Sequence, residues 1–160
     1  MPAPDRLILM GVFGAPQGVR GEMRIKSLTR DPKAIGAYGP LTDRKRARVF
    51  VFDSLRLIRD NMLVARVADV TTREAAAALT GAEIFARNCS PCHGPRMQDP
   101  ESAFDLRKFP PGEHDRFVRS VTNGKNQMPP WGDLLKSDDI EALWAYVIMG
   151  EKIKRPLPAP

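Results

Sequence analysis

Two cysteines and a histidine lie within five consecutive residues, and they are the part of this sequence with the clearest chemistry. The stretch CSPCH places Cys89, Cys92 and His93 in a Cys-x-x-Cys-His pattern. Two thiols at this spacing lie on one helical turn, so both can form thioethers with the two vinyl groups of one porphyrin, while the adjacent imidazole faces the iron. The pattern predicts covalent attachment of one c-type haem (haem c), with His93 as an axial ligand.

Two other chemistries use a Cys-x-x-Cys pair: redox-active dithiols and zinc sites. A dithiol of the thioredoxin type is expected near a βαβ pattern, and none surrounds this pair. A zinc site needs two further ligands, and the second histidine of the chain, His114, is too far from His93 for the usual finger spacing. Both chemistries remain as alternatives to haem.

A second iron ligand is predicted in the stretch NGKNQMPPWGDLL, where Met128 directly precedes Pro129 and Pro130. The prolines fix their own φ and bias the preceding residue to extended geometry, so the loop is stiff enough to hold a thioether sulfur against a metal. Met128 lies on no periodic apolar face, unlike methionines that fill a core. Histidine and methionine together fill both axial positions of the iron, which predicts electron transfer and not catalysis.

Two amphipathic helices are expected after the haem motif. Residues 113–124 carry apolar side chains at helical spacing and end in Asn-Gly. Residues 137–150 begin with Ser137 as the expected N-cap, and one face carries Ile140, Leu143, Trp144, Val147 and Ile148.

From GAEIFARNCSPCHG through MPPWGDLLKSDDIEALWAYV, residues 81 to about 150 resemble a class I c-type cytochrome. The resemblance implies an all-α domain in which Cys89 and Cys92 form the thioethers, His93 is the proximal ligand and Met128 the distal one. It also implies a redox partner, either a dehydrogenase or an oxidase or another cytochrome.

The net charge of the chain lies in its first half. Residues 1–80 carry 14 lysines and arginines against 8 acidic residues, whereas residues 81–160 carry 11 of each. A basic segment attracts phosphate backbones by releasing their counterions, so nucleic acid is a candidate partner there. The alternative is a soluble, salt-sensitive surface. No apolar run is long enough to span a membrane, and the run LILMGVF lacks the positive flank of a signal peptide.

The first half predicts a small β structure. Residues 5–15, 19–29, 46–54 and 61–70 are β-branched or alternate between apolar and polar side chains. The glycine-rich stretch from Gly14 to Glu22 is expected to be the turn between the first two strands.

The stretches LMGVFGAPQGVRGEMRIKSLTRDP, YGPL and VTTREAAAALTGAEIF resemble the N-terminal domain of the ribosome maturation factor RimM family, over residues 6–85. The resemblance implies a six-stranded barrel that binds the small ribosomal subunit and assists 16S rRNA maturation without being an enzyme. Gln17, Arg20 and Arg24 would be its ribosome contacts. Gln17 stands where the family usually has histidine, and the second barrel of the family is absent from this chain.

Residues 82–87 are a barrel strand in the RimM resemblance and part of a helix in the cytochrome resemblance. The stretch from Arg73 to Asn88 is rich in helix-forming residues, so we predict one helix that leads into the haem motif, with Gly81 allowing close approach of the last helix. The barrel would then lack its closing strand. Two small domains are expected: a RimM-like all-β barrel over residues 1–80 and a cytochrome c-like all-α domain over 81–152, followed by a loose proline-rich tail over 153–160.

The two halves imply different functions. The first hypothesis is a single-electron carrier with one covalent haem, and the alternative is a ribosome maturation module whose C-terminal domain has been replaced. Neither is an enzyme. The compartments also differ, because RimM-type factors work in the cytoplasm whereas c-type haem is attached in the periplasm. We therefore expect a chimera joined near residue 81.

Overall fold

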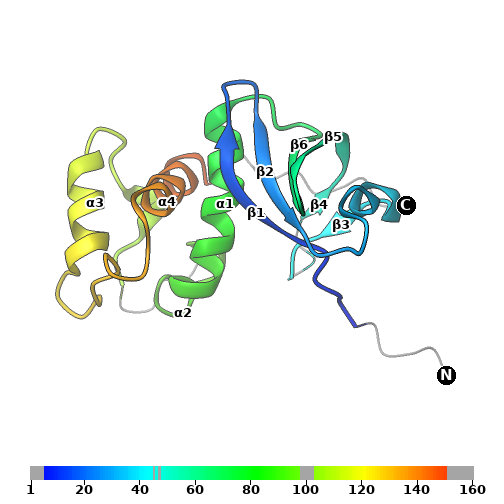
Figure 1. Cartoon of the computed structure of the whole chain (residues 1–160). Helices are drawn as coiled ribbons and strands as arrows, with labels where there is room; N and C mark the ends of the chain where they lie inside the picture. Colours follow the sequence, from blue (N-terminus) through cyan, green and yellow to red (C-terminus); the bar gives the residue numbers. More distant parts are fainter. Residues whose placement is uncertain (1–5, 45, 47, 98–102, 151–160) are drawn as a thin grey trace. The chain divides into compact units, whose positions relative to one another are not determined.

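The computed structural model describes residues 6–44, 46, 48–97 and 103–150 and divides the chain into two compact units. Unit 1 runs to Arg73 and contains the strands (Figure 1). Unit 2 begins at Glu74 and contains the helices α1 to α4. The predicted tail over residues 153–160 lies outside the described residues.

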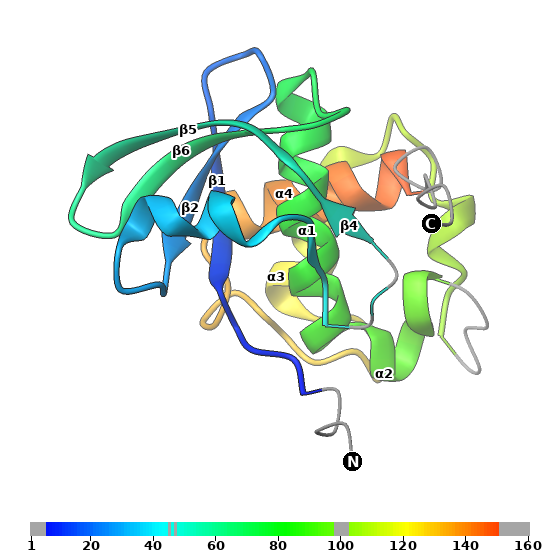
Figure 2. The ribbon, with the colours of Figure 1, turned by 90° about the vertical axis from the view of Figure 1, so that its right-hand side faces the viewer.

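Unit 1 is built on a four-stranded antiparallel sheet with the strand order β1-β2-β6-β5 (Figure 2). Its strands are β1 (Gly11–Gln17), β2 (Glu22–Ser27), β5 (Phe52–Arg59) and β6 (Met62–Val67). A two-stranded sheet pairs β3 (Leu41–Thr42) with β4 (Val49–Phe50), and the 3-10 helix η1 covers Pro32–Tyr38. This antiparallel β structure is consistent with a RimM-type barrel.

The core of unit 1 follows from alternation along its central strands. On β2, Met23 and Ile25 are buried while Arg24 and Lys26 are exposed. Side chains on a strand point alternately to opposite faces, so β2 has one apolar face and one charged face. On β6 the consecutive residues Leu63, Val64 and Ala65 are all buried. Ile35 of η1 is also buried.

The expected strand positions need three corrections. The first strand begins at Gly11 and not at residue 5, and the predicted Gly14–Glu22 turn is shorter because β1 continues to Gln17. Pairing with β2 continues past a register shift between Phe13 and Pro16. Proline is tolerated there because β1 lies at the edge of the sheet. The strand predicted over residues 46–54 is divided at Val51: β4 lies within it, and the long strand β5 begins at Phe52 and continues to Arg59.

The described residues of unit 2 form helices joined by loops, with one isolated β-bridge between Lys125 and Met128. Its helices are α1 (Arg73–Asn88), α2 (Ser90–His93), α3 (His114–Asn123) and α4 (Ser137–Met149), with 3-10 helices η2 (Pro95–Met97) and η3 (Leu106–Lys108). The predicted helix over residues 82–87 is confirmed, because α1 runs through this stretch without a break. Those residues therefore do not form a barrel strand in this structure.

Helices α1 and α4 pack closely at Gly81. A Cβ atom placed on Gly81 would lie only 1.9 Å from the carbonyl oxygen of Ala142, which confirms the predicted role of this glycine. One turn further along α1, the ring of Phe85 contacts that of Tyr146, with 5.2 Å between the centroids. Around this crossing lies the hydrophobic cluster of unit 2: Ala78, Ile84, Phe85, Met97, Phe117, Val121, Ile140, Ala142, Leu143, Tyr146 and Val147.

The predicted C-terminal end of α3 is confirmed, whereas the predicted N-cap of α4 is wrong. The C-cap of α3 is Gly124, with φ of 76°, as its Asn-Gly ending predicts. Ser137 is wrong as the N-cap of α4, because the cap is Lys136. The reason is Asp139, whose carboxylate accepts a hydrogen bond of 3.0 Å from the Lys136 backbone N–H. This bond stabilises Lys136 in the cap position, one residue before Ser137.

Within the described residues, no helix is both long enough and apolar enough to cross a membrane.

Candidate functional site

The Cys-x-x-Cys-His motif spans the junction of α1 and α2. The backbone N–H of Cys89 donates to the Phe85 carbonyl at 2.9 Å, and that of His93 donates to the Cys89 carbonyl at 3.0 Å. The helical path therefore continues through the motif and places both thiols and the imidazole within about one turn. This is the local arrangement that the spacing predicts.

The two thiols differ in environment. Cys89 is partly buried, whereas Cys92 is exposed. Burial raises the pKa of the Cys89 thiol to about 11, with a smaller contribution from Cys92. A thiol with a raised pKa forms little thiolate at neutral pH, so Cys89 is not expected to be the nucleophile of a thioredoxin-type dithiol.

His93 is held by a contact that the sequence does not reveal. Its Nδ1 lies 3.1 Å from the backbone carbonyl oxygen of Phe104, eleven residues later in the chain. A carbonyl can only accept, so Nδ1 carries the proton of the neutral ring and Nε2 keeps its lone pair. Metal-binding histidines commonly have this second hydrogen bond, which fixes the tautomer and the ring orientation.

Met128 closes a tight turn between α3 and α4. Lys125 and Met128 exchange both backbone hydrogen bonds, at 3.0 and 2.9 Å, and Asn126 within the turn has φ of 56°. The loop is also tied to α3, because the Trp131 N–H donates to the Val121 carbonyl at 2.9 Å. The stiffness predicted from the two prolines thus has additional support from hydrogen bonds.

The predicted haem residues fit a c-type haem in their chemistry. Cys89 and Met128 both pack, partly buried, against the hydrophobic cluster of unit 2. His93 offers Nε2 to a metal, and Cys92 is accessible for thioether formation. The meeting of His93 and Met128 at one iron stays a prediction.

The second predicted site is the β1–β2 turn of unit 1. Gly18 and Gly21 have φ of 66° and 75°, a left-handed conformation that glycine adopts at little cost. The Nε of Arg24 donates to the side-chain oxygen of Gln17 at 2.9 Å, so the structure brings two of the three predicted contacts together. Arg20 lies within the turn and is exposed.

Two arginines that sequence reasoning missed also reach this turn. The guanidinium of Arg66 donates to the Arg20 carbonyl at 3.4 Å, and that of Arg73 donates to the Gly18 carbonyl at 3.1 Å. Both are distant in sequence and exposed, so only the fold places them here. The turn is therefore surrounded by arginines from three segments of unit 1.

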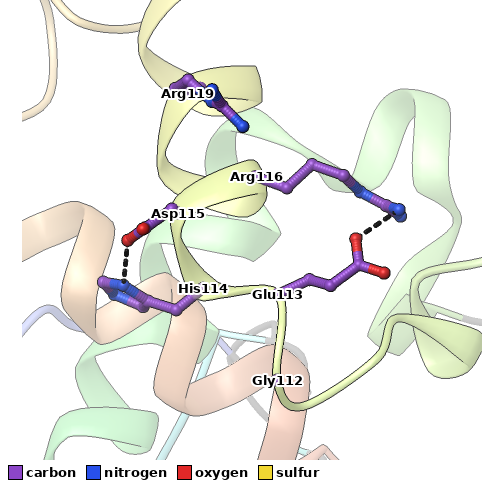
Figure 3. Close-up of a pocket in the computed structure, with 6 residues that line it drawn as sticks. All are labelled: Gly112, Glu113, His114, Asp115, Arg116 and Arg119. Carbon is purple, nitrogen blue, oxygen red and sulfur yellow. Dashed lines mark ion pairs between the residues drawn. The ribbon is translucent and has the colours of Figure 1, made fainter.

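A surface hollow of about 380 Å³ lies at the start of α3, and none of the predicted site residues lines it. Figure 3 shows two ion pairs among its lining residues: Arg116 pairs with Glu113, and His114 Nδ1 lies 3.5 Å from an Asp115 carboxylate oxygen. We assign this hollow no catalytic role.

The raised pKa of His114 leads us to expect that the stability of unit 2 depends on pH. Its Nε2 lies 2.9 Å from a carboxylate oxygen of Glu141 on α4, and this hydrogen bond is the main cause that raises the pKa of His114 above 6.5. A raised folded-state pKa stabilises the fold fully below the unfolded value and loses this effect as pH rises through the folded value. His114→Gln should therefore lower the free energy of unfolding at pH 5.5 or below, by the small amount typical of a surface pair (about 0.5 kcal/mol), and have less effect at high pH.

Urea unfolding followed across pH measures this difference. Glu141→Gln is the control, because it keeps the packing of His114 while removing its partner, and it should flatten the pH dependence in the same way. An equal loss of stability at low and high pH would contradict the assignment.

Comparison with known proteins gives one family match that covers half of the chain and a second that overlaps it. The sequence profile described as RimM N-terminal domain matches residues 8–89. The chain belongs to the RimM N-terminal domain family. The ribosome maturation factor RimM of Beijerinckia indica is 49% identical over 67 residues, covering 42% of this chain and 39% of that protein. RimM of Methylobacterium nodulans is 42% identical over 92 residues, covering 53% of this chain and 45% of that protein.

The chain thus matches less than half the length of these RimM proteins. A solved structure, a 16S ribosomal RNA processing protein RimM from Pseudomonas aeruginosa, is 25% identical and covers 44% of each chain with a TM-score of 0.39. A second profile, described as cytochrome C oxidase, cbb3-type, subunit III, matches residues 76–147. It overlaps the RimM match over residues 76–89, so the two matches share most of α1 instead of meeting at one junction.

Proposed function

We propose that the RimM-type unit acts as a binding module for the small ribosomal subunit, with a role in ribosome maturation and no enzymatic activity. The observation that carries this proposal is the match of residues 8–89 to the RimM N-terminal domain, supported by relatives that are named ribosome maturation factors. The comparisons favour this function over electron transfer, which the sequence alone had ranked first. The function implies a cytoplasmic protein.

The β1–β2 turn is the proposed contact. Gln17 and Arg24 are joined by a hydrogen bond, and Arg20 projects from the turn between two glycines. Arg66 and Arg73 donate to backbone carbonyls of the same turn and so restrict its movement. A rigid, exposed and basic loop is suited to a ribosomal partner because little conformational entropy is lost when it binds.

Co-sedimentation with purified small ribosomal subunits tests the proposal. The full chain should pellet with the subunits at low salt and be released as salt is raised. Arg20→Gln should weaken the association by up to about fivefold, the size of one exposed charge contact. Arg30→Gln, which removes an exposed arginine away from the turn, is the matched control. A chain that does not pellet at any salt concentration would refute the function.

A second candidate function, single-electron transfer, is favoured by the orientation of His93. The Phe104 carbonyl fixes Nδ1 as the protonated nitrogen and leaves Nε2 available. Cys89 and Cys92 would hold a c-type haem through thioethers, and His93 and Met128 would be its axial ligands. Such a haem supplies one-electron oxidation and reduction. The match to a cbb3-type oxidase subunit over residues 76–147 supports this candidate.

In that function, the residues of the chain position the group and exclude water. The Phe104 carbonyl orients the imidazole, and the hydrogen-bonded turn from Lys125 to Met128 would hold the thioether sulfur toward the haem. The hydrophobic cluster that contacts Cys89 and Met128 provides a low-dielectric wall. A dehydrogenase, or an oxidase or another cytochrome, would be the redox partner in the periplasm. The proposed chimera would combine this unit with the RimM-type unit.

Co-expression with c-type haem attachment machinery tests the second candidate. We expect a gain in protein mass equal to one haem, and its loss in the Cys89→Ala/Cys92→Ala double variant. Met128→Ala should keep the covalent mass but change the reduced visible spectrum, whereas Met149→Ala, which removes another methionine beside the same cluster, should leave it unchanged. An unmodified mass with all attachment factors present would refute this function.

A further inference from the structure

One face of the unit 1 sheet carries basic side chains at several positions. We call residues that lie opposite each other on neighbouring strands a row. In the pairing of β2, β6 and β5, Arg24 lies opposite Val64, and Val64 lies opposite Arg56. Residues directly opposite each other on paired strands point to the same face. Arg24 on β2 and Arg56 on β5 therefore share one face, on either side of the inner strand β6.

The neighbouring rows add to this face. Lys26 lies two residues after Arg24 on β2, and Arg66 lies two residues after Val64 on β6, so both point in the same direction as the first row. We call Arg24, Lys26, Arg56 and Arg66 the basic face. All four side chains are exposed.

The opposite face shows that this assignment of directions is correct. Met23, Ile25, Leu63 and Ala65 alternate with the basic positions and are at most 1% exposed. The apolar face thus carries the core of unit 1, and the four basic side chains point away from it. Val64, between Arg24 and Arg56 on the basic face, is itself only 3% exposed. A slip of one residue in register would exchange the two faces, which the burial of the four apolar side chains excludes.

We propose that the basic face binds the phosphate backbone of RNA. The proposal deepens the proposed ribosomal function, because it names RNA as the partner of unit 1. Strand geometry places Arg24 and Arg56 about 10 Å apart across β6, and Arg24 and Lys26 about 7 Å apart along β2. Three of the four cations are arginine, whose planar fork matches phosphate oxygens in a bidentate way.

Charge complementarity supports a polyanion as the occupant. Glu22, opposite Arg66, is the one acidic residue in the rows of β2, β6 and β5 that form this face. Residues 1–73 carry 14 lysines and arginines against 7 acidic residues. Counterion release from RNA would therefore contribute to binding at this face.

The arrangement favours RNA over an acidic polypeptide. An extended peptide usually adds to the edge of a sheet, where main-chain groups are free. The basic face instead spreads over β2, β6 and β5, and two of these strands are paired on both sides. Cations distributed over several strands can contact several phosphate groups of a folded RNA at once. The rows contain no aromatic side chain on which a base could stack, so we expect binding without strong sequence preference.

Fluorescence anisotropy with a labelled RNA hairpin of mixed sequence tests the inference on the full chain. The variant Lys26→Gln/Arg56→Gln removes two cations from the face. The matched control Arg30→Gln/Arg119→Gln removes the same charge from exposed positions outside it. The slope of log affinity against log salt should become shallower by about two in the first variant and by far less in the control. At fixed moderate salt, the first variant should bind about tenfold more weakly.

Three results would overturn the inference: no salt-dependent RNA binding by the wild type, an equal change in both double variants, or tighter binding of labelled poly-glutamate than of RNA. Circular dichroism checks that both variants remain folded, and the charge-preserving Arg56→Lys variant should retain most of the binding. Subunit co-sedimentation of the same proteins separates the two proposals. If the wild type co-sediments with the subunits but the two double variants change RNA affinity equally, only this inference is refuted. If the basic face binds RNA as expected but the chain does not co-sediment, only the ribosomal function is refuted.

Discussion

Replacing Gly81 with alanine should unfold unit 2 or destabilise it by about 3 kcal/mol or more. The added Cβ would lie 1.9 Å from the Ala142 carbonyl oxygen and 2.9 Å from the Cβ of Tyr146. The nearest obstacle is backbone of α4, which cannot turn aside as a flexible side chain can. Relief would require α1 and α4 to separate, and this would expose the cluster around Phe85.

Both tryptophans of the chain, Trp131 and Trp144, belong to unit 2, so their fluorescence reports the unfolding of this unit in urea. The control is Gly112→Ala, because a Cβ at that position meets no atom within 4 Å. Its effect should stay within about 0.5 kcal/mol. A Gly81→Ala variant as stable as this control would show that α1 and α4 do not cross as described.

Replacing Gly21 with alanine should destabilise unit 1 by about 3 kcal/mol, for two reasons. Gly21 has φ of 75°, which an L side chain rarely adopts. Its Cβ would also lie 2.3 Å from the Val70 carbonyl oxygen. Gly18→Ala separates these causes, because Gly18 has φ of 66° but no atom within 4 Å of its Cβ position. The control should cost only the backbone strain, about 1 kcal/mol.

Hydrogen exchange of peptides from β2 and β6 measures this prediction, since exchange of core strand amides follows the stability of the unit. Exchange should accelerate strongly in Gly21→Ala and mildly in Gly18→Ala. Similar acceleration in both would assign the whole effect to backbone strain and contradict the close approach to Val70.

The candidate sites were predictable from the sequence where their geometry is local. The Cys-x-x-Cys-His spacing predicts a single helical turn because helix periodicity depends only on neighbouring residues, and the bonds from Cys89 to Phe85 and from His93 to Cys89 form that turn. The glycines of the β1–β2 turn were identified for the same reason. The helix ends were predicted less well, since Asp139 competes with Ser137 for the start of α4.

Contacts between distant segments could not be predicted in this way. The carbonyl that orients His93 belongs to Phe104, and any of the intervening residues could have supplied it. Arg66 and Arg73 reach the β1–β2 turn over 46 and 55 residues. No local pattern in the sequence carries this information, because it depends on how the chain folds back on itself.

The sequence by itself determined the helix from Arg73 to Asn88, the haem-type motif at its end and the alternation of β2, because periodicity and propensity act between near neighbours. The two family resemblances gave residues 82–87 different structures, a barrel strand and a helix. The tertiary structure adds a physical reason for the helix, because the missing side chain of Gly81 lets α1 pack against α4. It also decided the basic face, because only the register between β2, β6 and β5 places Arg24, Arg56 and Arg66 on one side of the sheet.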